Sequence, residues 1–185
     1  MVDSGACIDP NKVCWYAMAP TFGRESRAKE YLDSRGVRCY LPTKEVVDAK
    51  TKHIKEIPVV RGLLFVYTSE SFLREICSDI PYLYYKYVRY GQRSYKMTIP
   101  TKQMDSFLRV SSICSKDVIY VDPQRMGIDL GEGTPIRVHS TNSLFDGVEG
   151  IYIKIKGRRS KHLVISLNGL LTVAAMVDVT LIEKI

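Results

Sequence analysis

Residues Ile57 to Thr68 read IPVVRGLLFVYT, and the rest of the chain is organised around this stretch. Its second half, Leu63–Thr68, is a continuous apolar run rich in β-branched and aromatic residues, which is typical of a strand buried on both faces. Its first half cannot continue that strand in regular pairing, because Pro58 has no N–H group and Gly62 indicates a bulge or a close backbone approach. The stretch therefore predicts a buried central strand that is entered through a kinked, partly exposed segment carrying Arg61.

The residues before this stretch predict a strand, a helix and a second strand. In the helix, Ala28, Tyr31 and Leu32 recur at i, i+3 and i+4, so they share one apolar face. Gly36 is a natural stop for that helix. A polar, lysine-rich segment then separates the second strand from the central one and predicts a hairpin loop. The expected elements are the strand Val13–Ala19, the helix Arg24–Arg35, the strand Arg38–Val47 and the loop Asp48–Lys55.

After the central strand we expect a second helix, a tyrosine-rich strand and a third helix. Phe72, Leu73 and Ile76 lie on one face of the second helix. Ser69 or Ser71 is its candidate N-cap. The order β-α-β-β-α-β-α predicts an α/β sandwich in which helices cover a mixed or mostly antiparallel sheet. The expected elements are the helix from Ser69 or Ser71 to Ser78, the strand Tyr82–Tyr90 and the helix that begins at Pro100-Thr101.

The last third of the chain has a different pattern. Ser111–Glu132 shows no sustained period, so we interpret it as a linker, and a short strand at Asp117–Val121 is left open. Beyond it, apolar and polar residues alternate over several short segments, and Asn168-Gly169 is a strong signal for a hairpin with a two-residue loop. This spacing predicts a small β-barrel of about five strands. The predicted fold class is therefore α+β.

Composition limits the classes of function. The chain of 185 residues has a formal net charge of +7, which weakly favours an anionic partner such as nucleic acid. Its five cysteines are scattered and its three histidines do not cluster, so we expect no disulfide framework and no metal site. No apolar run approaches the roughly 20 residues of a membrane helix, and Met1–Asn11 lacks the features of a signal peptide. These patterns predict a cytoplasmic protein without a membrane partner.

The sequence lacks the patterns of common catalytic sites. It contains no Gly-x-Ser-x-Gly, no His-Glu-x-x-His and no phosphate-binding loop. Gly127–Gly133 is rich in glycine, but no helical pattern follows it. Cysteines without a partnered histidine are poor candidates for a nucleophile. We therefore expect no enzyme activity, no catalytic residues and no cofactor.

The N-terminal half resembles the N-terminal (NGN) domain of NusG-type transcription elongation factors. Three features carry this resemblance: the Trp15-Tyr16 strand before a basic helix, the Tyr40-Leu41-Pro42 step, and the Pro-x-x-x-Gly-x-x-Phe-Val segment formed by Pro58, Gly62, Phe65 and Val66. The resemblance implies an NGN domain over residues 10–114. The divergent linker and the tyrosine-rich strand favour a specialised paralogue, similar to the UpxY-like antiterminators of capsular-polysaccharide operons.

The C-terminal part resembles the KOW domain of the same family, an SH3-like five-stranded barrel. Two features carry this resemblance: the Gly133-x-x-Ile136-x-Val138 segment and the Phe145-x-Gly147-x-x-Gly150 segment. It implies a linker over residues 115–130 and a KOW domain over residues 131–185. The β-branched alternation in this part favours a stable barrel, so we expect no refolding into helices.

The resemblance implies a non-enzymatic role on RNA polymerase. In the family, the N-terminal domain binds the clamp helices of the polymerase through an apolar patch, bridges the DNA channel and suppresses pausing and termination. The matching apolar residues here are Tyr40, Leu41, Val59, Val60 and Leu63, and the residues that match contacts to the polymerase gate loop are Arg74 and Glu75. The alternative is that the apolar residues are ordinary core and the charged ones are solvated.

Nucleic acid is the second partner that the resemblance implies. In specialised members, the first helix and the loop before it touch the non-template DNA strand, and the matching residues here are Thr21, Arg24, Arg27 and Tyr31. Arginine contacts phosphates and base edges, and tyrosine stacks on unpaired bases. Phe22 departs from the family pattern, because a basic residue often lies there. An ordinary solvated helix face is the alternative.

Basic residues also gather at one hairpin of the predicted KOW domain. They predict a surface that faces nascent RNA or the ribosome: Lys154, Lys156, Arg158, Arg159 and Lys161. A solvated hairpin tip that discourages edge pairing is the alternative. KOW domains of the family recruit a ribosomal protein or a termination factor. We expect a monomer, and the second interpretation of the whole chain is a KOW-type nucleic-acid-binding or ribosome-binding protein that does not act on polymerase.

Overall fold

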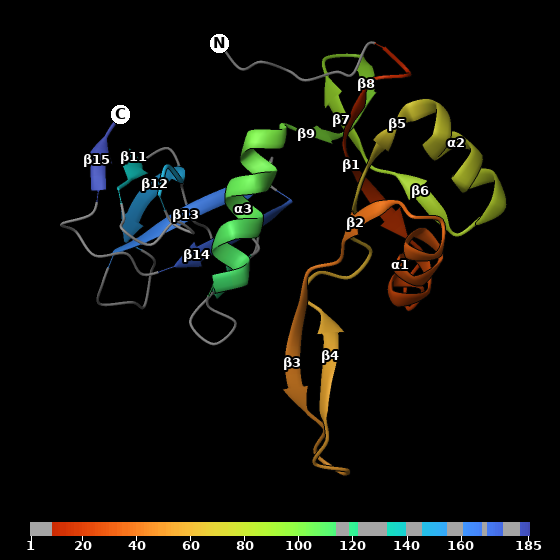
Figure 1. The fold of residues 1–185 in the computed structure, drawn as a ribbon, viewed down its shortest axis with the longest axis horizontal. Helices are drawn as coiled ribbons and strands as arrows, with labels where there is room; N and C mark the ends of the chain where they lie inside the picture. The colour runs from red at the N-terminus through yellow and green to blue at the C-terminus, as the bar shows by residue number, and fades with distance from the viewer. Residues whose placement is uncertain are drawn as a thin grey trace. The chain divides into compact units, whose positions relative to one another are not determined.

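The computed structural model describes residues 9–113, 119–121, 133–139, 146–154, 161–167, 170–175 and 182–185 (Figure 1). Contacts between residues divide the chain into two compact units, Met1–Thr101 and Lys102–Ile185. The described residues form three helices, and the strands pair in an antiparallel manner. These features confirm the predicted α+β class.

The N-terminal unit is built on a five-stranded sheet and two separate hairpins. Its elements are β1 (Val13–Pro20), α1 (Glu25–Ser34), β2 (Arg38–Tyr40), β3 (Thr43–Val47), β4 (Ile54–Pro58), β5 (Leu64–Ser69), α2 (Glu70–Asp79), β6 (Leu83–Tyr85), β7 (Tyr87–Tyr90), β8 (Arg93–Lys96) and β9 (Thr98–Ile99). The sheet has the order β2-β5-β1-β6, and β9 also pairs with β1. The hairpins are β3–β4, which extends away from the sheet in Figure 1, and β7–β8.

The strand β5 is the buried centre that the sequence predicts. Val66 lies opposite Tyr16 of β1 and opposite Cys39 of β2. Leu64, Phe65 and Val66 are all fully buried. On one face, Leu64 and Val66 join a cluster with apolar residues of both helices, namely Ala28 and Leu32 of α1 and Leu73 and Ile76 of α2. The predicted strand Leu63–Thr68 is confirmed as Leu64–Ser69.

The segment between β4 and β5 bends, as Pro58 and Gly62 predict. Gly62 has a φ of +64°, in the left-handed region that residues with a Cβ adopt only at a cost. The N–H of Val59 donates to the carbonyl of Pro42 at 2.8 Å. The N–H of Gly62 instead donates to a side chain of α1, Glu25. The kinked entry to the central strand is therefore confirmed.

Two predicted strands are divided in the structure. Arg38–Val47 forms β2 and β3, because Pro42 has no N–H with which to continue the ladder. Tyr82–Tyr90 forms β6 and β7, and Lys86 between them donates its N–H to a carbonyl of β1. The chain then turns back at Gly91, whose φ is +60°, and pairs with β8. The β7–β8 hairpin is absent from the sequence-based prediction.

The C-terminal unit contains a helix and a six-stranded sheet. Its elements are α3 (Thr101–Ile113, whose first residue ends the N-terminal unit), β10 (Ile119–Val121), β11 (Thr134–Val138), β12 (Glu149–Lys154), β13 (Lys161–Leu167), β14 (Leu171–Ala175) and β15 (Ile182–Lys184). The strand order is β10-β14-β13-β12-β11-β15. One strand more than expected is present because β10 forms inside the segment interpreted as a linker. Asn168-Gly169 lies outside the described residues. The strands on either side of it pair as the predicted hairpin, but Leu167 lies opposite Leu171, so three residues separate these partners and not the predicted two.

The helix α3 belongs with the C-terminal strands by its contacts. Lys102 forms an ion pair with Glu149 at 2.9 Å. Arg109 donates to the carbonyl of Asp146 at 3.1 Å. The contact-based boundary near residue 101 thus differs from the expected end of the N-terminal domain at residue 114. The assignment of residues 10–114, 115–130 and 131–185 to an NGN domain, a linker and a KOW domain stays a prediction.

Candidate functional site

The kinked segment before β5 contributes part of the apolar region that the family resemblance assigns to polymerase. Tyr40, Val59 and Val60 are half-buried. Leu41 and Leu63 are 6% and 1% exposed, and Leu41 belongs to the cluster between the sheet and its helices. Leu41 and Leu63 are therefore removed from the predicted patch. Their burial stabilises the fold, and they present almost no surface to a partner. Of these five residues, Tyr40, Val59 and Val60 are the ones that keep substantial area at the surface.

A buried carboxylate holds this segment against the start of α1. Glu25 is 4% exposed and lies in the first turn of α1, where the helix dipole favours a negative charge. Its Oε1 accepts the N–H of Gly62 at 2.9 Å. A Cβ at Gly62 would lie 3.4 Å from the carbonyl oxygen of Pro20, so the segment also passes close to the end of β1. Val59 and Val60 are thereby held in a defined position beside α1.

Arg61 and Phe22 connect the kinked segment to the turn before α1. The guanidinium carbon of Arg61 lies 4.7 Å from the centre of the Phe22 ring, which is a cation–π distance. Both side chains are exposed, Phe22 to 68%. Arg61 therefore places a positive charge beside Phe22, the residue at which the sequence departs from the pattern of the resemblance.

The residues predicted to bind nucleic acid gather around Tyr82. The N–H of Thr21 donates to the carbonyl of Tyr82 at 2.8 Å, which fixes the turn before α1 against the residue before β6. The guanidinium carbons of Arg24 and Arg27 lie 5.9 Å and 5.7 Å from the centre of the Tyr82 ring. Both arginines are exposed and the ring is half-buried. This Tyr82 surface, formed by Thr21, Arg24, Arg27 and Tyr82, combines cations with a ring, as sites for phosphates and unpaired bases do.

Tyr31 lies beside the Tyr82 surface, but its hydroxyl is engaged. The hydroxyl donates to Oδ2 of Asp79, at the end of α2, over 2.7 Å. This bond, and more weakly the neighbouring Tyr82, raises the pKa of Tyr31. Arg35 lies 3.9 Å from the same carboxylate oxygen. Because these contacts hold the half-buried ring between the two helices, a role for Tyr31 in base stacking stays a prediction.

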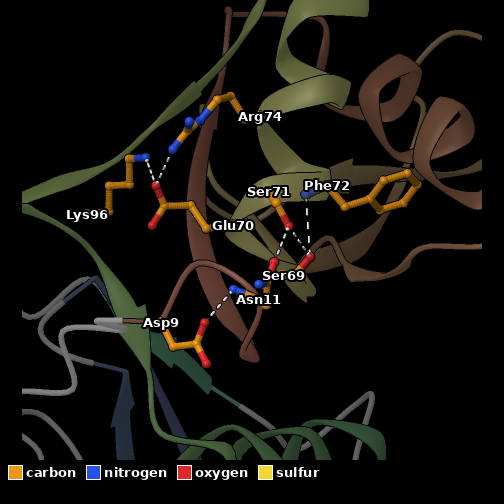
Figure 2. A network of polar contacts seen from close by, with 8 residues as sticks. All are labelled: Asp9, Asn11, Ser69, Glu70, Ser71, Phe72, Arg74 and Lys96. Carbon is orange, nitrogen blue, oxygen red and sulfur yellow. Dashed lines mark hydrogen bonds and ion pairs between the residues drawn. The ribbon is translucent and has the colours of Figure 1, made fainter.

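The two predicted gate-loop residues are both exposed on α2. Arg74 donates to Oε1 of Glu70 at 3.0 Å, and Glu75 follows it in the chain. Lys96 of β8 donates to the same oxygen of Glu70 at 2.6 Å, as Figure 2 shows. The bonds from Lys96 and Arg74 lower the pKa of Glu70, that from Lys96 most. Glu70 therefore joins α2 to the β7–β8 hairpin.

The start of α2 is capped by Ser69, one of the two N-cap candidates in the sequence. Oγ of Ser69 accepts the N–H of Phe72 at 3.4 Å and shares a 3.1 Å hydrogen bond with Oγ of Ser71. Ser71 donates to Oδ1 of Asn11 at 3.3 Å (Figure 2). The cap thus ties the helix that carries the predicted gate-loop residues to the segment before β1.

The predicted basic surface of the C-terminal domain falls mostly on residues that the structure does not describe. Lys156, Arg158 and Arg159 lie outside the described residues. The backbones of Lys154 and Lys161 pair at the ends of β12 and β13, so the predicted strands meet there. The role of this basic surface stays a prediction.

Sequence reasoning misses Glu25 and Tyr82 as parts of this region. An acidic residue in the first turn of a helix is normally solvated. The bond from the N–H of the kinked Gly62 to Glu25 becomes visible only in the structure. Tyr82 has the pattern of a strand residue, although Pro81 before it marks a turn that could have placed it at the edge of the sheet.

Comparison with known proteins identifies the family. The family model described as "Transcription termination factor nusG" matches residues 13–108 of the chain. The solved structure titled "Domain interaction in Thermotoga maritima NusG" has 17% sequence identity, covers 96% of this chain and 99% of its own, and gives a TM-score of 0.43. A comparison with curated proteins finds no match. Within the described residues, no helix is long and apolar enough to span a membrane. Since the family model matches more than half of the residues of this chain, the chain belongs to the NusG family of transcription factors.

Proposed function

We propose that this chain is a transcription elongation and antitermination factor that binds the clamp helices of RNA polymerase through its N-terminal unit. The observation that carries the proposal is the family match over residues 13–108, because this range contains every residue assigned to polymerase contact. The factor suppresses pausing or termination and acts on specific operons. Its contribution is binding alone: it holds the polymerase closed around the template and performs no chemistry.

The geometry of the kinked segment supports this proposal. Tyr40, Val59 and Val60 keep apolar area at the surface, and an exposed apolar patch on a folded domain usually marks a partner. The bond from Gly62 to Glu25 fixes the segment before any partner binds, so little conformational entropy is lost on binding.

The Tyr82 surface supports a second contact, to the non-template DNA strand in the transcription bubble or to nascent RNA. Arg24 and Arg27 supply charge for phosphates, and the Tyr82 ring supplies a face for an unpaired base. Arg61 on Phe22 extends the same combination to the neighbouring turn. The C-terminal unit recruits a further partner in this proposal, either a ribosomal protein or a termination factor.

Capture of the chain by isolated clamp helices tests the proposal. We expect Val60→Asp and Tyr40→Asp to abolish capture, because each places a charge in the apolar contact. Val47→Asp is the matched control, since Val47 is 60% exposed on the separate β3–β4 hairpin. Leu63→Asp is unsuitable, because a charge at a buried position unfolds the domain. Retained capture by both patch variants would refute the proposed contact.

Clamp-helix capture, measured together with RNA binding, distinguishes the proposed function from the alternative one. A chain that binds RNA tightly and is not captured by clamp helices is a KOW-type nucleic-acid-binding or ribosome-binding protein. Occupancy of the chain along the genome then tests operon specificity. A signal confined to a few long operons supports the specialised role, and a signal over all genes supports a general elongation factor.

A further inference from the structure

The residues from Tyr82 to Lys96 have an unusual composition. They include six tyrosines and four cations but no acidic residue; the tyrosines are Tyr82, Tyr84, Tyr85, Tyr87, Tyr90 and Tyr95, and the cations are Lys86, Arg89, Arg93 and Lys96. Apart from Tyr82, none of these belongs to the proposed polymerase or non-template contacts. Most of them lie on β6 and on the β7–β8 hairpin.

The β7–β8 hairpin and the neighbouring strand β6, which carries Tyr84, expose both rings and charges. Tyr84, Tyr87 and Tyr90 are 57%, 57% and 54% exposed. Arg89 and Arg93 are also exposed, and in the described part of the chain neither has a carboxylate partner. Large exposed rings beside uncompensated positive charges complement a ligand that is both flat and anionic.

The pairing of β7 with β8 places these groups on both faces. Tyr90 lies directly opposite Arg93, and the Tyr90 and Tyr95 ring centres are 6.1 Å apart on the same face. Side chains alternate between the faces of a strand, so Tyr87 and Arg89 share the other face. Packing between tyrosines accounts for part of this pattern, because Tyr90 contacts Tyr95 and the Tyr87 ring centre lies 6.5 Å from that of Tyr85 on β6. It does not explain why Tyr87 and Tyr90 both stay more than half exposed, or why the hairpin carries positive charge.

The base of the hairpin is fixed by Lys96, whose charge has a structural role, whereas the cations nearer the tip do not have this role. Lys96 donates to Glu70 on α2 at 2.6 Å, and its Nζ lies 4.2 Å from the centre of the Tyr85 ring. The N–H of Lys86 donates to the carbonyl of Ala17 at 3.0 Å. The hairpin is therefore anchored to α2 and β1, while Arg89 and Arg93 remain available.

We propose that the β7–β8 hairpin is a binding surface for single-stranded nucleic acid. Unpaired bases stack on Tyr87 and Tyr90, and Arg89 and Arg93 contact the phosphates. A duplex offers phosphates but keeps its base faces stacked, so it satisfies only the arginines. An acidic protein surface likewise offers charge without flat rings. The surface is distinct from the Tyr82 surface and does not depend on polymerase binding.

Fluorescence anisotropy of the full chain with labelled oligonucleotides tests the inference. The probes are a single-stranded oligo-dT, a single-stranded oligo-U of the same length and a blunt DNA duplex. We expect both single strands to bind more tightly than the duplex. The ratio of the affinities for oligo-dT and oligo-U shows whether the hairpin prefers single-stranded DNA or RNA.

Variants of the hairpin give the decisive comparison. Tyr87→Ala is expected to weaken binding of single strands by about tenfold, the usual effect of losing one base–aromatic stack. Tyr87→Phe keeps the ring and is expected to change the affinity by less than about twofold. Arg89→Glu with Arg93→Glu is expected to reduce both the affinity and its dependence on salt. The exposed control is Ile54→Ala on the β3–β4 hairpin.

Failure of this inference can be distinguished from failure of the proposed function. Hairpin variants should be captured by clamp helices as well as the wild type is, because the hairpin is not part of the apolar patch. Unchanged single-strand binding in both Tyr87→Ala and the double arginine variant, with an unchanged circular dichroism spectrum, would overturn the inference. Equal weakening on duplex and single strands in Tyr87→Ala would overturn it too, because stacking would then play no part.

Discussion

Lys96 of β8 donates to Oε1 of Glu70 of α2 at 2.6 Å, and the Glu70 side chain is 17% exposed. This ion pair joins the hairpin that carries the exposed tyrosines to the helix that carries Arg74 and Glu75. Arg74 donates to the same carboxylate oxygen, so one acidic side chain positions both elements (Figure 2). Two surfaces of the N-terminal unit therefore share one anchor.

Replacing Glu70 by Gln is expected to lower the free energy of unfolding by about 1 kcal/mol at neutral pH, because Lys96 and Arg74 lose a charged partner. The pKa of Glu70 is lowered in the folded chain. Its stabilising effect is therefore complete above the pKa of the unfolded chain, about 4.3, and is lost as the pH falls through the folded-state pKa. The difference between wild type and variant in urea unfolding should shrink as the pH falls below that value.

Glu75→Gln is the matched control for this measurement, since Glu75 is exposed on the same helix. It should change the free energy of unfolding by less than about 0.5 kcal/mol. A Glu70→Gln deficit that stays constant down to acidic pH would contradict the assigned ion pair.

Glu25 and Gly62 are expected to behave as a coupled pair. Glu25→Ala removes the acceptor of the Gly62 N–H, which should cost about 1–2 kcal/mol because a half-buried donor is left unpaired. Gly62→Ala should cost about 1–2 kcal/mol, because its φ of +64° disfavours a Cβ. Since both changes release the same kink, the double variant should lose less than the sum in chemical unfolding. Strict additivity would show that the bond does not hold the kink.

How far the fold follows from the sequence is clear from β5 and the β7–β8 hairpin. β5 is predictable because a continuous apolar run has only one stable place, the interior of a sheet. The hairpin is not, because tyrosine suits both buried and exposed strands, and Tyr82–Tyr90 therefore has the pattern of a single strand. Gly91 is the only local sign of its turn, and its φ of +60° becomes visible only in the structure.

The sequence predicts which segments form the candidate site, but not which of their side chains are exposed. Resemblance to the family located the kinked segment and the turn before α1. It could not distinguish the buried Leu41 and Leu63 from the half-buried Val59 and Val60, because all four are apolar and lie in irregular backbone. Long-range contacts such as that of Arg61 with Phe22 leave no periodic signal.

The thiols of Cys39 and Cys77 are expected to react slowly in the folded chain. Burial, helped by the nearby Asp33, raises the pKa of Cys39 to about 12, and burial also raises the pKa of Cys77. Because the thiolate is the reactive form, alkylation at mildly alkaline pH should be far slower than in the unfolded chain. Mass spectrometry of timed iodoacetamide labelling measures this directly. Equal rates in the native and urea-unfolded chain would contradict the burial of these thiols.

The contact of Arg61 with Phe22 is expected to matter for binding more than for stability. An exposed cation–π pair contributes about 0.5–1 kcal/mol, so Phe22→Ala should unfold at nearly the wild-type urea concentration. If the Tyr82 surface and this pair contact the non-template strand together, Phe22→Ala should still be captured by clamp helices but crosslink less to that strand in a reconstituted transcription bubble. Phe22→Tyr keeps a ring for Arg61 and should restore crosslinking. Loss of capture along with crosslinking would instead place Phe22 in the polymerase contact, and unchanged crosslinking would remove it from the nucleic-acid contact.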